Sequence, residues 1–247
     1  MSLLPPAPPR LPPGLRVYAV GDVHGRLDLM LAMERLIAAD QAGFRGETIE
    51  VWLGDYIDRG PDSKGAVERL IARAEAGERL VTLRGNHEAY ILDFPDDPNE
   101  LRRWLRFGGR SALASYGLET SAIGDEDILA HAPQLTAAAL AAIGERHLAF
   151  YRRTLLSWRA GDYFFVHAGV RPGVALDRQE MRDLISIREP FHSHEGEFGA
   201  FVVHGHTPAL EPVVRSNRIC LDTTAWDTGV LTCLVLEGAE RRFLATG

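Results

Sequence analysis

The chain has 247 residues, of which 46% are hydrophobic and 25% are charged, as is typical of a soluble globular protein. Its formal net charge of −7 argues against a protein that mainly binds a nucleic-acid backbone, because that task needs clustered Lys and Arg. No stretch reaches the roughly 18 apolar residues that a membrane span requires, and no signal-peptide pattern is visible. We therefore expect a cytoplasmic protein with neither a nucleic-acid nor a membrane partner.

The first 14 residues are rich in proline, with six prolines between Pro5 and Pro13. Proline has no backbone N–H to donate and favours an extended polyproline backbone, so the composition predicts a flexible arm over residues 1–14. The pattern then becomes regular, and we predict one domain over residues 15–247.

Apolar runs next alternate with segments of helical periodicity. This alternation predicts strands over residues 15–22, 48–55 and 78–86, with helices over 26–40 and 62–77 between them. Consecutive strand–helix units give parallel strands joined by right-handed crossovers, and ligands bind beyond the carboxyl ends of such strands.

The second half of the chain has a different pattern. Residues from about 93 to 156 are rich in Ala, Leu and Arg at helical spacing, which predicts a helical insertion. Four apolar runs separated by turns follow, over residues 163–170, 201–207, 212–222 and 229–238, and predict a second, partly antiparallel sheet. The expected fold class is α/β, with two stacked mixed sheets flanked by helices.

Each of the first three predicted strands ends in a glycine followed by polar residues, in the motifs GDVHG, GDYIDRG and GNHE. Asp22 and Asp55 are 33 residues apart, and Asp55 and Asn86 are 31 residues apart. Each interval is about one strand–helix unit, so these side chains should meet at one edge of the sheet.

Two later strands place imidazoles at similar positions, in FFVHAG and VVHGHT. Five strand ends are therefore expected to bring one set of metal ligands into one cavity: Asp22, His24, Asp55, Asn86, His167 and His206. Carboxylate, amide and imidazole groups without a thiolate suit two divalent ions such as Mn, Fe or Zn, and the central Asp55 is the natural bridge. Any one of these residues alone would more often be a helix cap or a packed core residue, but three such motifs at strand-end spacing are not accidental.

These motifs, together with HAG and HGHT, resemble those of the calcineurin-like metallophosphoesterases. Within that superfamily, DYIDRG and LRGNHE are most similar to the compact bacterial and phage form of the PPP-type serine/threonine protein phosphatases. The resemblance covers about residues 17–236. It implies a four-layer α/β/β/α sandwich, with helices outside and two sheets inside.

The resemblance also implies how the ligands divide between two ions. Asp22, His24 and Asp55 would hold one ion, and Asp55, Asn86, His167 and His206 would hold the other. Pro208 stands where wider members of the superfamily have a second histidine, so one ion would have fewer protein ligands, as in the phosphatase branch. His204 precedes His206 by two residues, and the sequence leaves open whether it contacts the site.

The catalytic roles follow from the same resemblance and from the chemistry of the residues. Two divalent ions would supply a metal-bridging hydroxide as the nucleophile, most simply with Mn as the metal. Arg59, Arg188 and Asn86 are expected to bind the substrate phosphate. His87 is expected to protonate the leaving oxygen, while Asp58 orients it and raises its pKa.

The main functional interpretation is a metal-dependent phosphomonoesterase that removes phosphate from serine and threonine of proteins, with dual specificity that includes tyrosine as a variant of the same interpretation. The alternative is a symmetrical bis(5'-nucleosyl)-tetraphosphatase, a small-phosphoester hydrolase that shares the same motifs. A metal-dependent nuclease is disfavoured by the acidic balance and by Pro208. An aromatic stacking platform beside the pocket would favour the dinucleotide, whereas an open, shallow groove would favour a phosphoprotein. Thr224 and Trp226 change the cleft wall relative to small members of the family, which bears on substrate preference.

Overall fold

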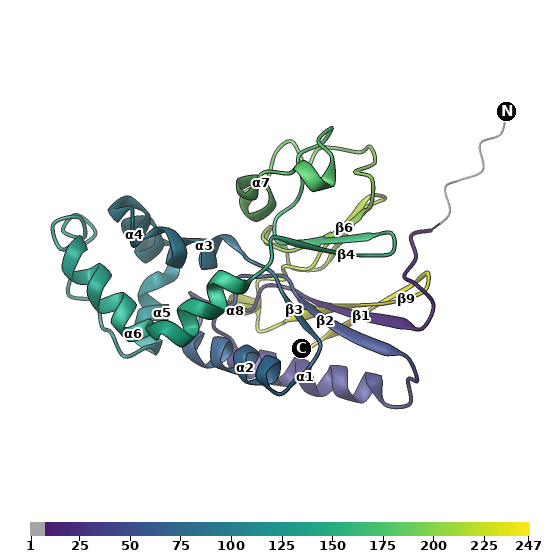
Figure 1. Cartoon of the computed structure of the whole chain (residues 1–247), viewed down its shortest axis with the longest axis horizontal. Coiled ribbons are helices and arrows are strands. Elements are labelled where there is room, and N and C mark those ends of the chain that lie inside the picture. The colour runs from purple at the N-terminus through teal and green to yellow at the C-terminus, as the bar shows by residue number, and fades with distance from the viewer. Residues whose placement is uncertain (1–7) are drawn as a thin grey trace.

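The computed structural model describes residues 8–247, in which two five-stranded sheets pack between helices (Figure 1). The strand order is β10-β9-β1-β2-β3 in the first sheet and β4-β5-β6-β8-β7 in the second. The strands are β1 (Leu15–Val20), β2 (Glu47–Trp52), β3 (Leu80–Thr82), β4 (Ser157–Ala160), β5 (Tyr163–Val166), β6 (Phe201–His204), β7 (Val213–Val214), β8 (Arg218–Cys220), β9 (Thr232–Glu237) and β10 (Glu240–Ala245). The predicted α/β fold with two stacked mixed sheets is confirmed.

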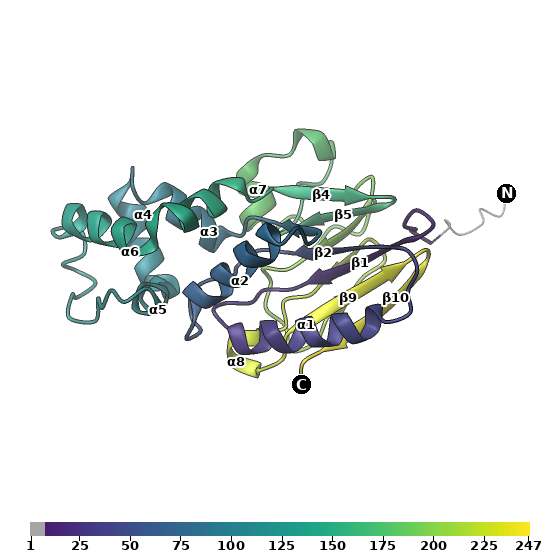
Figure 2. The same cartoon turned by 60° about the horizontal axis from the view of Figure 1, so that its bottom comes forward.

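Helices cover the outer faces of the sheets and gather at one side of them. They are α1 (Leu27–Gln41), α2 (Ser63–Glu75), α3 (Asn86–Asp93), α4 (Pro98–Trp104), the π-helical turn η1 (Leu105–Gly109), α5 (Arg110–Ser115), α6 (Ala132–Arg153), the short 3-10 turn η2 (Leu176–Arg178), α7 (Met181–Ser186) and α8 (Ala225–Thr228). Helices α1 and α2 lie along the first sheet, and α7 lies over the second (Figure 2). Helices α4, α5 and α6 form a lobe beside the sheets (Figure 1). This lobe falls within the predicted helical insertion.

Alternation along the strands explains the layers. On β1, Val17 and Ala19 pack between the two sheets, whereas Tyr18 and Val20 face the helices. Strand β5 alternates in the same way, with Phe165 between the sheets and its neighbours packed toward α7. Successive side chains of a strand point to opposite faces, so strands that are apolar at every position become buried on both faces.

The parallel pairing of β1 with β2 and of β2 with β3 agrees with the strand–helix pattern. The prediction that residues 229–238 belong to the second sheet was wrong. Strand β9 pairs antiparallel with β1 in the first sheet, opposite Val20 at Cys233, and not with the strands that precede it in the chain. Buried β1 would otherwise have an open edge, and β9 closes it while burying its own two faces. Strand β10, which no sequence pattern indicated, then covers the edge of β9.

The predicted Pro-rich arm lies partly outside the described residues, which begin at Pro8. In the described part, the backbone N–H of Leu11 donates to the Gly238 carbonyl at 2.9 Å, and its side chain is buried between the sheets. The Tyr163 hydroxyl donates to the Pro9 carbonyl at 3.1 Å. This part of the predicted arm is therefore packed rather than loose.

Across residues 8–247, no helix combines the length and the apolar character that crossing a membrane requires. The two cysteines, Cys220 and Cys233, are buried and unpaired.

Candidate metal centre and active site

The six predicted metal ligands meet beyond the carboxyl ends of β1, β2, β3, β5 and β6. Two groups of side chains offer ligand atoms that all lie within 4.8 Å of one another. His24, Asp55 and His87 form one group, and Asp55, His167 and His206 form the other. Asp55 belongs to both groups, which is the position expected of a bridging ligand.

The remaining two predicted ligands adjoin these groups. An Asp22 carboxylate oxygen accepts the backbone N–H of His206 at 3.1 Å. The Asn86 side-chain oxygen lies 3.2 Å from Nε2 of His167. All six residues therefore line one small region of the structure.

The backbone of this region is locally unusual. Six non-glycine residues between residues 8 and 247 have positive φ, and all six lie in or beside the site: His24, Asp55, Asp58, Arg59, His206 and Thr224. Such a backbone costs on the order of 1–3 kcal/mol per residue and persists only where the surrounding structure holds it. The strand ends thus bend sharply to turn these side chains toward one another.

Two glycines allow the acids to approach the backbone. A Cβ atom on Gly85 would lie 2.0 Å from an Asp55 carboxylate oxygen, and one on Gly205 would lie 2.0 Å from an Asp22 oxygen. No other residue type would fit at either position, which gives a physical reason for the glycines of GNHE and HGHT.

Hydrogen bonds to main-chain carbonyls orient two of the imidazoles. Nδ1 of His24 is 2.9 Å from the Ile57 carbonyl, and Nδ1 of His167 is 2.9 Å from the Leu53 carbonyl. A carbonyl can only accept, so each Nδ1 carries the proton and each Nε2 faces Asp55, at 3.6 and 3.4 Å. This arrangement is the usual way to fix the tautomer of a metal-binding histidine.

Burial keeps two of the histidines neutral. It lowers the pKa of His206 to about 3 and holds the pKa of His24 well below its ordinary value. A neutral imidazole has a lone pair to donate, whereas an imidazolium has none. Both side chains are therefore in the protonation state that a metal ligand needs.

A chain of hydrogen bonds holds His87. Its Nδ1 is 2.5 Å from a carboxylate oxygen of Asp58, which also accepts the Trp104 indole N–H at 2.9 Å. Burial opposes the charged form of His87, but Asp55 and Asp58 raise its pKa above the ordinary value. Because Nδ1 faces Asp58, Nε2 is the nitrogen that faces the cavity.

Glu88 has a structural position. Its two carboxylate oxygens accept the backbone N–H groups of Asp55, Tyr56 and Gly85 at 2.8 to 2.9 Å. It therefore caps the start of α3 and fixes the loop that carries Asp55.

The ligand groups open into a cavity of about 180 Å³. Its lining includes the two predicted phosphate-binding arginines, Arg59 and Arg188. The Arg59 guanidinium lies 3.4 Å from Nε2 of His87 and over the ring of Trp226, at 5.4 Å from its centroid. His204, by contrast, packs edge-on against Phe191 and belongs to neither ligand group.

A family model for calcineurin-like phosphoesterases matches residues 15–228. The chain belongs to the calcineurin-like phosphoesterase family. The resemblance found in the motifs is thereby confirmed.

Several relatives of this phosphoesterase have curated names. The chain is 27% identical over 278 residues to a symmetrical bis(5'-nucleosyl)-tetraphosphatase of Methylobacillus flagellatus, with 92% of this chain and 94% of the relative covered. It is 25% identical over 226 residues to PrpE, an asymmetrical bis(5'-nucleosyl)-tetraphosphatase of Bacillus velezensis, with 83% and 82% covered. It is 33% identical over 93 residues to serine/threonine-protein phosphatase 1 of Salmonella typhimurium, with 38% of each chain covered.

A solved structure with a proposed assignment as a diadenosine tetraphosphatase has the same fold. It aligns with a TM-score of 0.62 and 21% sequence identity, covering 97% of this chain and 98% of that one.

Calcineurin-like phosphoesterases typically bind two divalent metal ions, and the residues of this chain suit them. Burial, together with the charges of Asp222 and Asp55, raises the pKa of Asp22 well above its ordinary value. Among the described residues, neither Asp22 nor Asp222 forms an ion pair with a Lys or Arg, and the Arg59 charge only partly offsets the burial that raises the pKa of Asp222. Divalent cations would balance these buried acids, so the donor set fits the family's metals.

Three residues around the phosphoesterase site escaped the sequence analysis. Asp222, beyond the end of β8, lines the cavity, as does Phe107 of η1. Trp104 of α4 binds Asp58. Asp222 follows an apolar run, as the other acids of the site do, and that pattern could have revealed it; the two aromatic residues lie in the helical lobe, where no comparable signal exists.

Proposed function

We propose that this phosphoesterase hydrolyses a phosphoanhydride bond of dinucleoside polyphosphates such as diadenosine tetraphosphate. The observation that carries the proposal is a pair of exposed aromatic side chains beside the cavity. Phe107 lines it and is 57% exposed, and Trp226, 39% exposed, lies beside Arg59. Exposed aromatic faces stack nucleobases, and stacking contributes about 1–3 kcal/mol per base.

The size of the cavity indicates that it would bind only the phosphates of this substrate and not its nucleosides. A cavity of about 180 Å³ is smaller than the roughly 300–1,000 Å³ of pockets that enclose a whole drug-sized ligand. It suits one or two phosphate groups, and the nucleosides would then lie on the surface around it. The names of the two tetraphosphatase relatives, which cover most of this chain, agree with that substrate class.

Asp22, His24, Asp55, Asn86, His167 and His206 would hold the two metals. Bound divalent ions lower the pKa of water and neutralise phosphate oxygens. Arg59 and Arg188 line the same cavity and would bind the non-bridging oxygens of the reacting phosphate.

His87 would hold a proton at Nε2 for the leaving group. Asp58 occupies Nδ1, and although burial opposes the charged ring, Asp55 and Asp58 raise the pKa of His87, which favours its protonated form. The nearby Arg59 guanidinium and Nε2 of His87 are both donors, so they converge on the place where a substrate oxygen would lie. With a nucleotide as the leaving group, which departs as a stable phosphate anion, this proton matters less than it would for the alkoxide of phosphoserine.

A serine/threonine protein phosphatase is the second candidate. The likeness to the Salmonella typhimurium phosphatase, over 93 residues, and the motifs DYIDRG and LRGNHE favour it. The exposed aromatics and the coverage of the tetraphosphatase relatives favour the dinucleotide more.

A comparison of substrates tests the proposal. The protein reconstituted with Mn²⁺ should show a higher kcat/KM for diadenosine tetraphosphate than for a phosphoserine or phosphothreonine peptide. Chromatography of the products locates the cleaved bond, since two ADP molecules indicate symmetrical cleavage and ATP with AMP indicates asymmetrical cleavage. A preference for the peptide would replace the proposal by the second candidate.

A further inference from the structure

A second hollow beside the active site is lined by arginines. It has a volume of about 320 Å³, and its lining consists of Asn99, Arg102, Arg103, Arg106 and Phe107. The stretch 101–110 carries four arginines and no acid, although the chain as a whole has a net charge of −7. This hollow is therefore a local concentration of positive charge on an acidic protein.

Phe107 connects the arginine hollow to the active-site cavity, because its side chain lines both. The backbone around it is docked on the catalytic turn. The Arg59 N–H donates to the Gly108 carbonyl at 3.5 Å, and Gly108 has a φ of 122° that lets the two segments approach. A Cβ atom on Gly108 would lie 3.0 Å from the Arg59 nitrogen. The arginines of α4 and η1 are thus held in a fixed place relative to the cavity.

Charges within the lobe neutralise these arginines only in part. Arg103 pairs with Glu100 at 2.7 Å, and Arg106 lies 3.4 Å from Asp125, which Arg110 also holds at 2.8 Å. Arg102 is half-buried and has no acidic partner among the described residues. Positive charge therefore remains available to a ligand in this hollow.

We propose that this arginine hollow is the subsite for the half of the substrate that lies away from the reacting phosphate. Resting on the proposed function, this inference assigns the distal phosphates of a dinucleoside polyphosphate to Arg102 and Arg106. It assigns a nucleobase to the exposed face of Phe107. A substrate with several linked phosphates extends from the metal centre in a way that a phosphomonoester does not, and only such a substrate reaches both hollows. The subsite would therefore determine how many linked phosphates the preferred substrate carries, and it would leave the chemistry at the metal centre unchanged.

The test is a double variant, Arg102→Ala/Arg106→Ala, measured with diadenosine tetraphosphate and with p-nitrophenyl phosphate. The KM for the dinucleotide should rise about tenfold, because two exposed charge contacts are lost, while its kcat stays the same. Kinetics with p-nitrophenyl phosphate, which reaches only the metal centre, should not change. Replacing both arginines by lysine should restore part of the loss.

The matched control is Arg35→Ala/Arg45→Ala, which removes the same charge from exposed positions in and after α1. An equal rise in KM in the control would overturn the subsite, since net charge alone would then explain the effect. So would an unchanged KM in the Arg102→Ala/Arg106→Ala protein, or an equal loss with a phosphopeptide. If the proposed function is wrong, the result is different: the unmodified protein cleaves p-nitrophenyl phosphate but not the dinucleotide. That result would also refute the subsite.

Discussion

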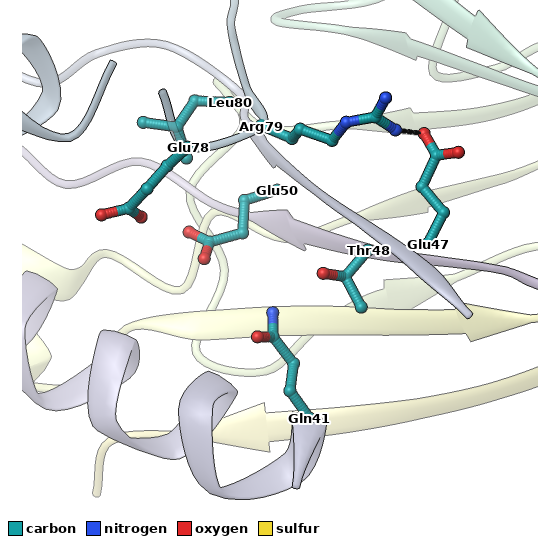
Figure 3. Close-up of a pocket in the computed structure, with 7 residues that line it drawn as sticks. All are labelled: Gln41, Glu47, Thr48, Glu50, Glu78, Arg79 and Leu80. Carbon is teal, nitrogen blue, oxygen red and sulfur yellow. Dashed lines mark hydrogen bonds and ion pairs between the residues drawn. The ribbon is translucent and has the colours of Figure 1, made fainter. Parts of the chain in front are cut away.

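Two polar hollows lie at opposite ends of the first sheet, and their charges are arranged in opposite ways. The hollow at the amino ends of β2 and β3 has a volume of about 480 Å³ and is lined by Gln41, Glu47, Thr48, Glu50, Glu78, Arg79 and Leu80 (Figure 3). Its acids are paired with arginines. Arg73 contacts Glu50 at 2.6 Å and Glu78 at 2.7 Å, and Arg79 pairs with Glu47, as the dashed line in Figure 3 shows.

The cavity at the carboxyl ends of the same strands is smaller, at about 180 Å³, yet its acids are more deeply buried, and among the described residues none of them forms an ion pair with an arginine. Asp55 contacts three imidazoles and accepts the backbone N–H of His87, and although burial opposes its charge, the imidazoles hold its pKa well below the ordinary value. Asp22 has no such support, since burial and the charge of Asp222 raise its pKa. A buried charge without a partner is unfavourable for folding, so a protein keeps several together only where a bound cation or a reaction uses them. The balance of charge, and not the size of the hollow, distinguishes the candidate active site.

The largest expected effect comes from the acid that both ligand groups share. Replacement of Asp55 by Asn should remove the metals and lower kcat/KM by roughly 10³-fold or more, since Lewis-acid stabilisation contributes several kcal/mol. Metal content after dialysis and steady-state kinetics measure the two effects. Glu47→Gln, in the other hollow, should change neither quantity. A variant Asp55→Asn that kept two metals would refute the bridging role.

The His87→Asn variant separates the metal centre from proton transfer. It should retain both metals and lose ~10² to 10⁴ in rate on a phosphoserine peptide, whose leaving alkoxide needs a proton. The loss should be smaller on diadenosine tetraphosphate, because a nucleotide leaves readily as an anion. His87 also lies within reach of His24 and Asp55, so loss of a metal from this variant would mean that His87 is a ligand.

Substitutions that break the ion pairs of the hollow at the amino ends of β2 and β3 should change stability and not activity. Arg73→Met leaves Glu50, which is 7% exposed, without its cation and should lower the free energy of unfolding by about 3–5 kcal/mol. Arg79→Met, which breaks an exposed pair, should cost less than about 1 kcal/mol. Urea denaturation compares the two variants, and activity per folded molecule should stay constant. An equal loss of unfolding free energy in the two variants would show that burial does not determine how much an ion pair contributes.

The comparison also shows how far sequence reasoning could reach. Asp22, Asp55 and Asn86 could be placed together because each ends a strand of a regular strand–helix series, and parallel strands end at one edge. The sheet to which β9 belongs could not be predicted, since TCLVLE is apolar enough to be buried on both faces in either sheet. Local pattern determines which face of a strand is buried but not which strand lies beside it.

The helical lobe was predictable as helix but not as part of the site. Trp104 has the spacing of an ordinary core residue, and it does stack on Phe94 with ring centroids 5.2 Å apart. Its indole N–H nevertheless binds both oxygens of Asp58, 46 residues earlier in the chain. Only the three-dimensional structure shows that this side chain belongs both to the core and to the hydrogen bonds of His87.

Trp104→Phe tests this double role with the smallest expected effect. Phenylalanine preserves the stacking on Phe94 but cannot donate a hydrogen bond to Asp58, so His87 should be held less firmly. Groups that support a catalytic residue in this way typically contribute about 10–100-fold, and we expect a loss of kcat near the lower end with both metals retained. A purely structural residue would lower the rate equally for every substrate. If Trp104 acts through His87, the loss of rate should instead be greatest for leaving groups of high pKa and should vanish for p-nitrophenolate. Rates measured on a series of phosphate esters of graded leaving-group pKa therefore distinguish the two roles of Trp104. A uniform loss across that series would place Trp104 in the core alone.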